Sequence, residues 1–146
     1  ASFLVKSNKL NCGVYIDPQK WAFKKTENTE SEFEFSLKNK DAYATFITER
    51  IEIPLETLKA IALENAQSVA PDIKIVKEDY RWVNKNLVMS LQMEGAIQGM
   101  KITYTGYYYA SPNGTIQLVA FTSTNLFDEY KAFFDELLNG FVTLEK

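Results

Sequence analysis

Polar side chains that could do chemistry gather near the middle of the sequence. Asp79 and Arg81 lie two residues apart in "KEDYRW", and a strand would place both on one face. That face would carry the polar residues of two neighbouring strands: Lys77, Asp79, Arg81, Ser90, Gln92 and Glu94. Such a set could line a cleft in which Asp79 holds Arg81 in place. A solvated sheet face with an ordinary surface ion pair is the simpler interpretation, and the sequence favours it.

Catalysis has few candidate residues, because the chain contains no histidine and one cysteine, Cys12. The missing histidine removes the commonest general base and the commonest metal ligand. Zinc would have only carboxylates and one thiol, which is a poor ligand set. The glutamates of "ENTESEFE" could bind calcium weakly, but a solvated strand is expected there. We therefore expect no enzyme, no cofactor and no metal; a hydrolase with Asp79 or Glu94 as its base is the weakest alternative.

The composition predicts one ordinary globular domain. A chain of 146 residues with 46% hydrophobic residues can bury a core of its own. A net charge of −3 gives no basic field that would attract nucleic acid, and the apolar runs are too short to cross a membrane. A start at Ala1 suits a removed export signal, which we favour, or a segment cut from a longer chain. We expect a single domain over residues 1–146, with an irregular segment at 1–12.

Two helices and six strands would position the polar residues. Strict alternation in "ESEFEFSLK" predicts a strand that forms a hairpin with "AYATFITE". Helical spacing of apolar residues predicts helices in "PLETLKAIALENAQSV" and "NLFDEYKAFFDELLNGF", the second with Asn125 as its N-cap. Further strands are expected near 73–83, 87–94, 100–110 and 115–123. The order β-β-α-β-β-β-β-α predicts an α+β protein, a three-layer α/β/α sandwich with a helix on each face of a mostly antiparallel six-stranded sheet.

Loop length sets the register of the hairpin around Asn84 and Lys85. A two-residue loop pairs Trp82 with Leu87 and collects the apolar side chains of both strands on one face. We prefer this register, because a slip by one residue would move every side chain to the wrong face.

The last hairpin carries three consecutive tyrosines, Tyr107 to Tyr109. A three-residue turn, Pro112-Asn113-Gly114, with Gly114 in a left-handed bulge position, would place Tyr108 opposite Leu118 and Tyr109 opposite Gln117. We expect Tyr108 to be structural, with its two neighbours on the other face of the strand. Packing of the whole run under a helix is the simpler interpretation of these tyrosines.

The two hairpins together supply the candidate binding residues. These are Tyr107, Tyr109, Gln117, Lys77, Asp79, Arg81 and Gln92.

The pattern and order of segments resemble those of the PsbP-like group. The segments that carry the resemblance are "DAYATFITE", "WVNKN" and "GYYYASPNGTIQLVAFTSTNLFDEYKAFFDELLNGF". Lys85 stands where related sequences are expected to have a glycine. The group includes extrinsic proteins of photosystem II, DcrB-type envelope lipoproteins and a Ran-binding nuclear factor. The resemblance implies a three-layer α/β/α sandwich that binds other proteins and has no shared catalytic residues.

These observations predict a non-enzymatic protein-interaction module of the cell envelope, periplasmic or envelope-associated, with another protein as its partner. A carrier of a small amphipathic or apolar ligand is the alternative, because 14% of the residues are aromatic. A nucleic-acid partner is not expected, and a cytoplasmic location stays open.

Overall fold

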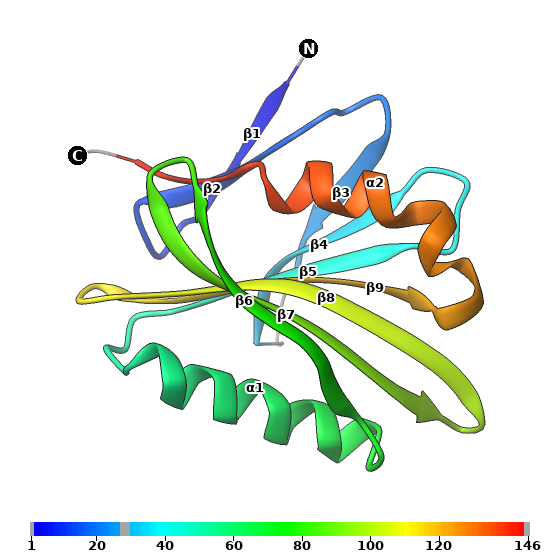
Figure 1. The fold of residues 1–146 in the computed structure, drawn as a ribbon. Coiled ribbons are helices and arrows are strands. Elements are labelled where there is room, and N and C mark those ends of the chain that lie inside the picture. The colour runs from blue at the N-terminus through cyan, green and yellow to red at the C-terminus, as the bar shows by residue number, and fades with distance from the viewer. Residues whose placement is uncertain (1, 27–29, 145–146) are drawn as a thin grey trace.

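The computed structural model describes residues 2–26 and 30–144, which form two antiparallel sheets and two helices (Figure 1). The large sheet has seven strands in the order β3-β4-β5-β9-β8-β7-β6, and the small sheet has the order β1-β2-β10. The large sheet comprises β3 (Trp21–Lys25), β4 (Ser31–Leu37), β5 (Tyr43–Glu49), β6 (Lys74–Val83), β7 (Asn86–Ile97), β8 (Met100–Ser111) and β9 (Gly114–Ser123). The small sheet comprises β1 (Phe3–Lys6), β2 (Cys12–Ile16) and β10 (Phe141–Thr143).

The α+β class and the antiparallel pairing are confirmed, but the six-stranded sheet is a wrong prediction. Trp21–Lys25 adds a seventh strand, β3, by pairing with β4, although it carries no clear alternation of its own. The expectation of an irregular segment at 1–12 is wrong for Phe3–Lys6, which forms β1 by pairing with β2. Both strands depend on partners outside their own segment, so no local pattern marks them.

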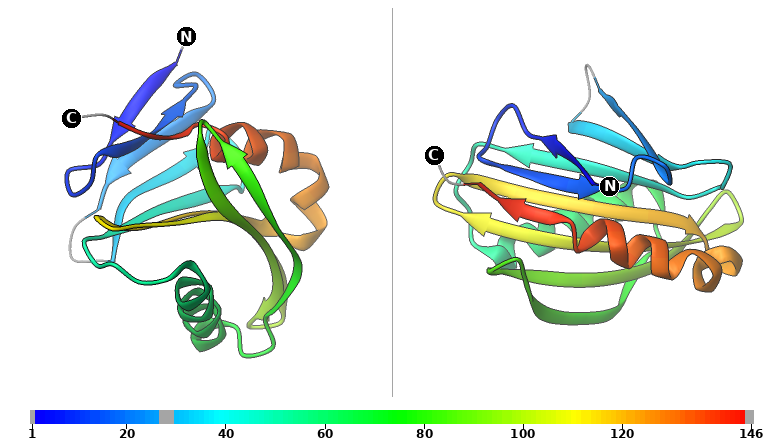
Figure 2. Two further views of the ribbon diagram at one scale, coloured as in Figure 1. Left: turned by 60° about the vertical axis from the view of Figure 1, so that its left-hand side comes forward. Right: turned by 90° about the horizontal axis from the view of Figure 1, so that it is seen from above.

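The helices cover opposite faces of the large sheet. Helix α1 (Leu55–Val69) lies under one face, while α2 (Phe127–Leu138) and the small sheet lie over the other (Figures 1 and 2). On α1, Leu58 and Ala62 are buried against Met89, Leu91 and Tyr108. In Figure 2, β3 to β5 extend beyond α1, so their face on that side has no helical cover.

Helix α2 packs through the apolar stripe that its spacing predicts. Its buried residues are Phe127, Tyr130, Phe134, Leu137 and Leu138. Asn125 is not its N-cap: it lies in a 3-10 turn over Thr124–Leu126 and accepts a hydrogen bond from the Ser123 hydroxyl at 2.8 Å. Packing against the sheet therefore positions this helix, whose N-cap Leu126 provides no side-chain hydrogen bond.

The register predicted for the β6–β7 hairpin is confirmed, with Trp82 opposite Leu87. Asn84 and Lys85 have φ angles of 49° and 72°, both positive, as the two central residues of a type I′ turn require. The shared apolar face is only partly covered, however. Trp82 stays 74% exposed and Tyr80 52% exposed.

The register predicted for the β8–β9 hairpin is wrong by one residue. Its loop has two residues, because Ser111 pairs with Gly114, and Tyr108 therefore lies opposite Gln117 instead of Leu118. A Cβ at Gly114 would overlap the carbonyl oxygen of Glu49 on β5, so glycine is needed here for the close approach of another strand. The glycine serves this tertiary contact and not the bulge that local turn chemistry suggests.

Glu32 is buried, although alternation along its strand predicts a solvated face. A register shift between Ser31 and Phe33 turns it inward, where its Oε1 accepts hydrogen bonds from Ser7 Oγ at 2.7 Å and Thr48 Oγ1 at 2.6 Å. Glu27 of the suggested calcium site lies outside the described residues. Over residues 2–26 and 30–144 no group of three or more acidic or cysteine side chains could hold a metal ion. Within the same ranges no helix has the length and apolarity needed to cross a membrane.

Candidate functional site

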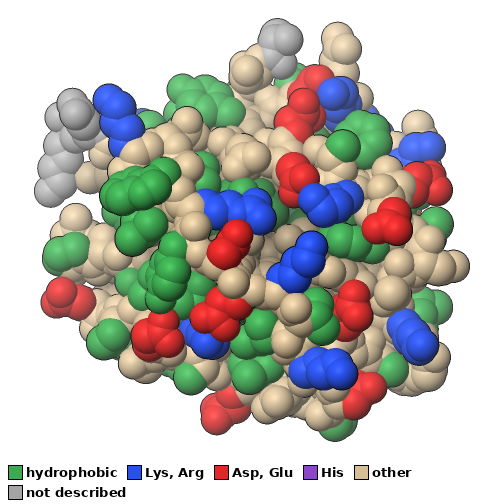
Figure 3. All heavy atoms as spheres, viewed as in Figure 1, with side chains coloured by type: hydrophobic (Ala, Val, Ile, Leu, Met, Phe, Trp, Pro, Cys, Tyr) green, Lys and Arg blue, Asp and Glu red, His purple; other side chains and the backbone are tan. Residues whose placement is uncertain are grey.

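A polar cleft lies between the β6–β7 hairpin and α2. It encloses about 440 Å³ and is lined by Lys77, Glu78, Asp79, Arg81, Ser90, Gln92, Thr105, Lys131 and Asp135. Most of the polar residues singled out in the sequence thus come together, and α2 adds the last two members. Glu94 does not line the cleft. Figure 3 shows basic and acidic side chains crowded together over the middle of this face.

Arg81 is the best-anchored cation of the cleft. Its Nε lies 3.3 Å from Asp79 Oδ1, and its Nη1 donates to the Tyr107 hydroxyl at 3.4 Å. The hydrogen bond to Tyr107 raises the pKa of Arg81 most, and the charge of Asp79 adds to it against the opposing effect of burial. Because both charged side chains remain about half exposed, the ion pair itself contributes little to stability. Its effect is to orient the guanidinium.

Four polar side chains of the cleft have no hydrogen bond or ion pair among the described residues: Lys77, Ser90, Gln92 and Thr105. Across the cleft, Lys131 and Asp135 of α2 pair with each other at 3.1 Å. Lys77 and Gln92 lie opposite each other on β6 and β7, and they have the longest of these four side chains. An ammonium and an amide are therefore available to a ligand, beside the anchored guanidinium of Arg81. This arrangement can bind a carboxylate or a backbone amide.

The other candidate residues lie elsewhere. Tyr107 is 2% exposed and reaches the cleft only through Arg81. Tyr109 packs on Phe141 of β10, with ring centroids 5.5 Å apart. Gln117 is buried on the opposite face of the sheet, opposite Tyr108. The structure therefore groups Lys77, Asp79, Arg81 and Gln92, and it separates Tyr109 and Gln117 from them.

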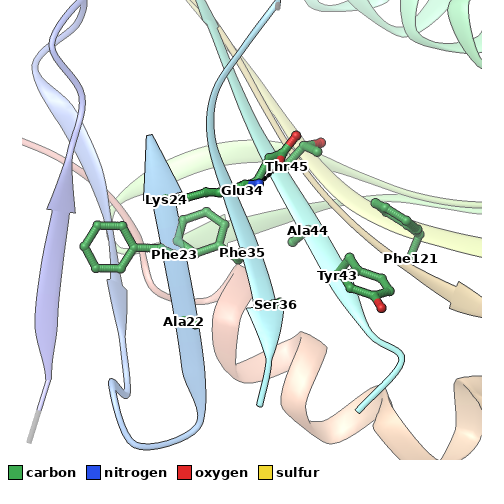
Figure 4. A pocket seen from close by; sticks show the side chains of 10 residues that line it. All are labelled: Ala22, Phe23, Lys24, Glu34, Phe35, Ser36, Tyr43, Ala44, Thr45 and Phe121. Atoms are coloured by element: carbon green, nitrogen blue, oxygen red, sulfur yellow. Dashed lines mark ion pairs between the residues drawn. The ribbon is translucent and has the colours of Figure 1, made fainter. Parts of the chain in front are cut away.

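An apolar groove that the sequence did not reveal lies on the part of the sheet that α1 leaves uncovered (Figure 4). It encloses about 460 Å³ and is lined by Ala22, Phe23, Lys24, Glu34, Phe35, Ser36, Tyr43, Ala44, Thr45 and Phe121. Tyr43 and Phe121 stack in a tilted pair, 5.8 Å between centroids. Lys24 and Glu34 form an ion pair of 3.6 Å beside them. The pairing of β5 with β9 creates this groove, and α1, β6, β7 and β8 lie between those two strands in the sequence.

The sequence matches no protein-family model, and no curated protein matches it significantly. Solved structures do match. The cyanobacterial PsbP protein CyanoP of Synechocystis superposes with a TM-score of 0.73 at 10% identity, over 98% of this chain and 92% of that chain. LpqN of Mycobacterium tuberculosis, which is involved in cell envelope biogenesis, gives 0.63 at 8% identity, over 99% and 91%.

A protein of unknown function from Pseudomonas aeruginosa, PA94, has a TM-score of 0.61 at 10% identity, over 99% of both chains. Identities this low show a shared fold and nothing about activity. The resemblance drawn from the order of segments is confirmed at that level: the chain has the PsbP-like fold.

Proposed function

We propose that this chain is a non-enzymatic protein-interaction module of the cell envelope, and that the polar cleft recognises its partner. The observation that carries the proposal is that the side chains of Lys77 and Gln92 have no protein partner among the described residues and lie beside the anchored Arg81. Preorganised donors on rigid strands suit recognition, because little ordering is required when the partner binds. The cleft contains three cationic side chains and three carboxylates, and each carboxylate already has a partner.

The partner that suits this cleft presents a carboxylate together with backbone amide groups. Lys77 would take the carboxylate, and Gln92 would bond a peptide group. The absence of histidine and the burial of Cys12 support a binding role over a catalytic one. A structural neighbour, LpqN, is involved in cell envelope biogenesis, which supports the envelope as the place of action.

The test is a photo-crosslinking amino acid placed at position 92 in the cleft and, as a control, at Gln67 on the exposed side of α1. We expect one discrete crosslinked protein from position 92 in intact cells and none from position 67. Lys77→Glu should remove that product, because it replaces the free ammonium by a like charge to the partner's carboxylate. Identical products from both positions, or no effect of Lys77→Glu, would count against the cleft.

The apolar groove supports a second candidate, a carrier of a small amphipathic ligand. Its lining combines the Tyr43–Phe121 pair with the charged Lys24 and Glu34, as an amphipathic ligand requires. Native mass spectrometry of gently purified protein should then reveal a bound small molecule. Phe121→Ala should release it, whereas Tyr15→Ala, which removes an exposed ring outside the groove, should not. Protein with no bound small molecule would eliminate the carrier.

A further inference from the structure

Strand β6 leaves one side of its backbone without a partner among the described residues. It stands at the end of the seven-stranded sheet, and eight of its ten residues are exposed. After a bulge at Val76, the segment from Lys77 to Val83 pairs with β7 in unbroken register. Every second residue of such an edge directs its N–H and C=O outward, which makes the strand a template for another strand.

We propose that β6 pairs antiparallel with β6 of a second copy of this chain, about a two-fold axis at Tyr80, and so joins two seven-stranded sheets. The proposal uses Asp79 and Arg81, which also line the polar cleft, but it does not require the function assigned to that cleft. The side-chain sequence of the edge selects both the partner and the register.

Symmetry leaves few registers to consider. Opposite residues of an antiparallel pair point to the same face, so the two-fold axis must pass through a residue and not between two residues. An axis at Glu78, Asp79 or Arg81 would place that charged residue opposite itself. Directly opposed like charges destabilise a sheet.

An axis at Tyr80 gives the opposite result. It places Asp79 of each copy opposite Arg81 of the other, which forms two ion pairs across the axis. No charged residue between Lys77 and Val83 then meets a like charge. An unrelated partner strand would have to supply this pattern independently, whereas a second copy supplies it by symmetry.

The other face of β6 provides apolar contacts at the same axis. Tyr80 would meet Tyr80 of the second copy, and each Trp82 would lie diagonally across from the opposite tyrosine, within reach of its ring. These are two of the most exposed large side chains, at 52% and 74%. Figure 3 shows hydrophobic side chains gathered on this side of the molecule.

Helix α1 already holds this face of β6 in position. The Tyr80 hydroxyl donates to Glu56 Oε2 at 2.8 Å, and Lys59 pairs with Glu78 at 2.8 Å. The aromatic surface is therefore ordered before the second copy arrives, which reduces the entropy that pairing would cost. The joined sheet would keep both polar clefts on one side, one next to each β6.

Sedimentation velocity over a concentration series tests the proposal. The wild-type chain is expected to shift from monomer to dimer as its concentration rises. Asp79→Arg and Arg81→Asp should each weaken dimerisation by about tenfold or more, because each creates two like-charge contacts. The double variant Asp79→Arg/Arg81→Asp should recover wild-type association. Glu64→Arg, which makes the same charge change as Asp79→Arg on the exposed side of α1, should have no effect.

Disulfide trapping tests the axis itself. Tyr80→Cys should form a covalent dimer rapidly under mild oxidation, since the two positions are directly opposite. Tyr15→Cys, of similar exposure, should not, and Cys12 is buried. Circular dichroism of every variant separates loss of pairing from loss of folding. A monomer at all concentrations, a dimer insensitive to both single reversals, or a double variant that does not recover would overturn the proposal.

Discussion

Arg81 of β6 donates a hydrogen bond to the hydroxyl of Tyr107 of β8 at 3.4 Å, and that hydroxyl donates in turn to Asn139 Oδ1 at 2.7 Å. The contacts connect the edge of the sheet to the end of α2. A tyrosine that is almost fully buried therefore orients a guanidinium in the polar cleft. The shape of the cleft depends on a residue that a ligand would not need to touch.

Removing the Tyr107 hydroxyl should destabilise the fold. Tyr107→Phe leaves the Asn139 amide oxygen without its donor, and the expected loss in unfolding free energy is about 1–2 kcal/mol. Urea denaturation measures it. Tyr108→Phe is the matched control: this hydroxyl has no hydrogen bond within the described ranges, so a change below about 0.5 kcal/mol is expected. A larger loss from Tyr108→Phe than from Tyr107→Phe would contradict the role given to this contact.

Docking of α2 should depend on Phe134 and Leu137, which are 0% and 1% exposed. Truncation of either to Ala should lower the free energy of unfolding by about 2–5 kcal/mol, because each leaves a cavity in the core. Phe133→Ala, on the same helix but only partly buried, should cost clearly less. Unchanged melting temperatures for the first two variants would show that α2 is not docked as described.

Gly140 should not tolerate a side chain. A Cβ there would overlap the carbonyl oxygen of Tyr15, whose N–H donates to the Gly140 carbonyl at 2.8 Å. Gly140→Ala should therefore separate β10 from β2 and cost about 2–3 kcal/mol.

Gly99→Ala is the comparison for this variant. Gly99 has a φ of +82° and no atom within 4 Å of an added Cβ, so only backbone strain of about 1 kcal/mol is expected. Thermal unfolding ranks the two variants, and the reverse order would count against the close contact.

Cys12 should make stability depend on pH in the alkaline range. Burial, more than the nearby charge of Glu32, raises the pKa of its thiol from 9.0 to about 12. The fold therefore favours the neutral thiol. This contribution is complete below about pH 9 and is lost as the pH rises toward 12.

The test measures the free energy of unfolding of wild type and of Cys12→Ala at pH 8 and at pH 11. Between pH 8 and pH 11 this free energy should fall less in the variant than in wild type, because the variant has no buried thiol to ionise. Burial also raises the pKa of Tyr104 and Tyr108, so both proteins should retain a common alkaline decline. An identical pH dependence would show that the thiol ionises as readily in the folded chain as in the unfolded one.

Local patterns predict the helices and the first of the two long hairpins well. Pro54 and Pro71 bound α1, and apolar spacing identifies the buried stripe of α2. The β6–β7 register follows from a two-residue loop, because one face of the hairpin must be apolar for packing. In each case the decisive interactions join residues that are close in sequence.

The candidate site was predicted only in part. The spacing of Lys77, Asp79 and Arg81 shows that they share a face, but the sequence favoured a solvated surface. Lys131 and Asp135 of α2 complete the cleft, and no periodicity in β6 could indicate that this helix lies above it. The groove beside Tyr43 and Phe121 was also missed, because it forms only where β5 pairs with β9, and no local pattern in the sequence indicates that pairing.

The sequence by itself determined the class of the fold, the content of its helices and the shortage of catalytic side chains, because composition and short-range periodicity carry that information. The tertiary structure alone decided the seventh strand, the small sheet, the burial of Glu32 and the β8–β9 register. At Gly114, contact with Glu49 on β5 prevailed over the local preference for a bulge. Turn preferences are small local energies, whereas a one-residue shift changes the packing of an entire face, so the long-range contacts determine the register.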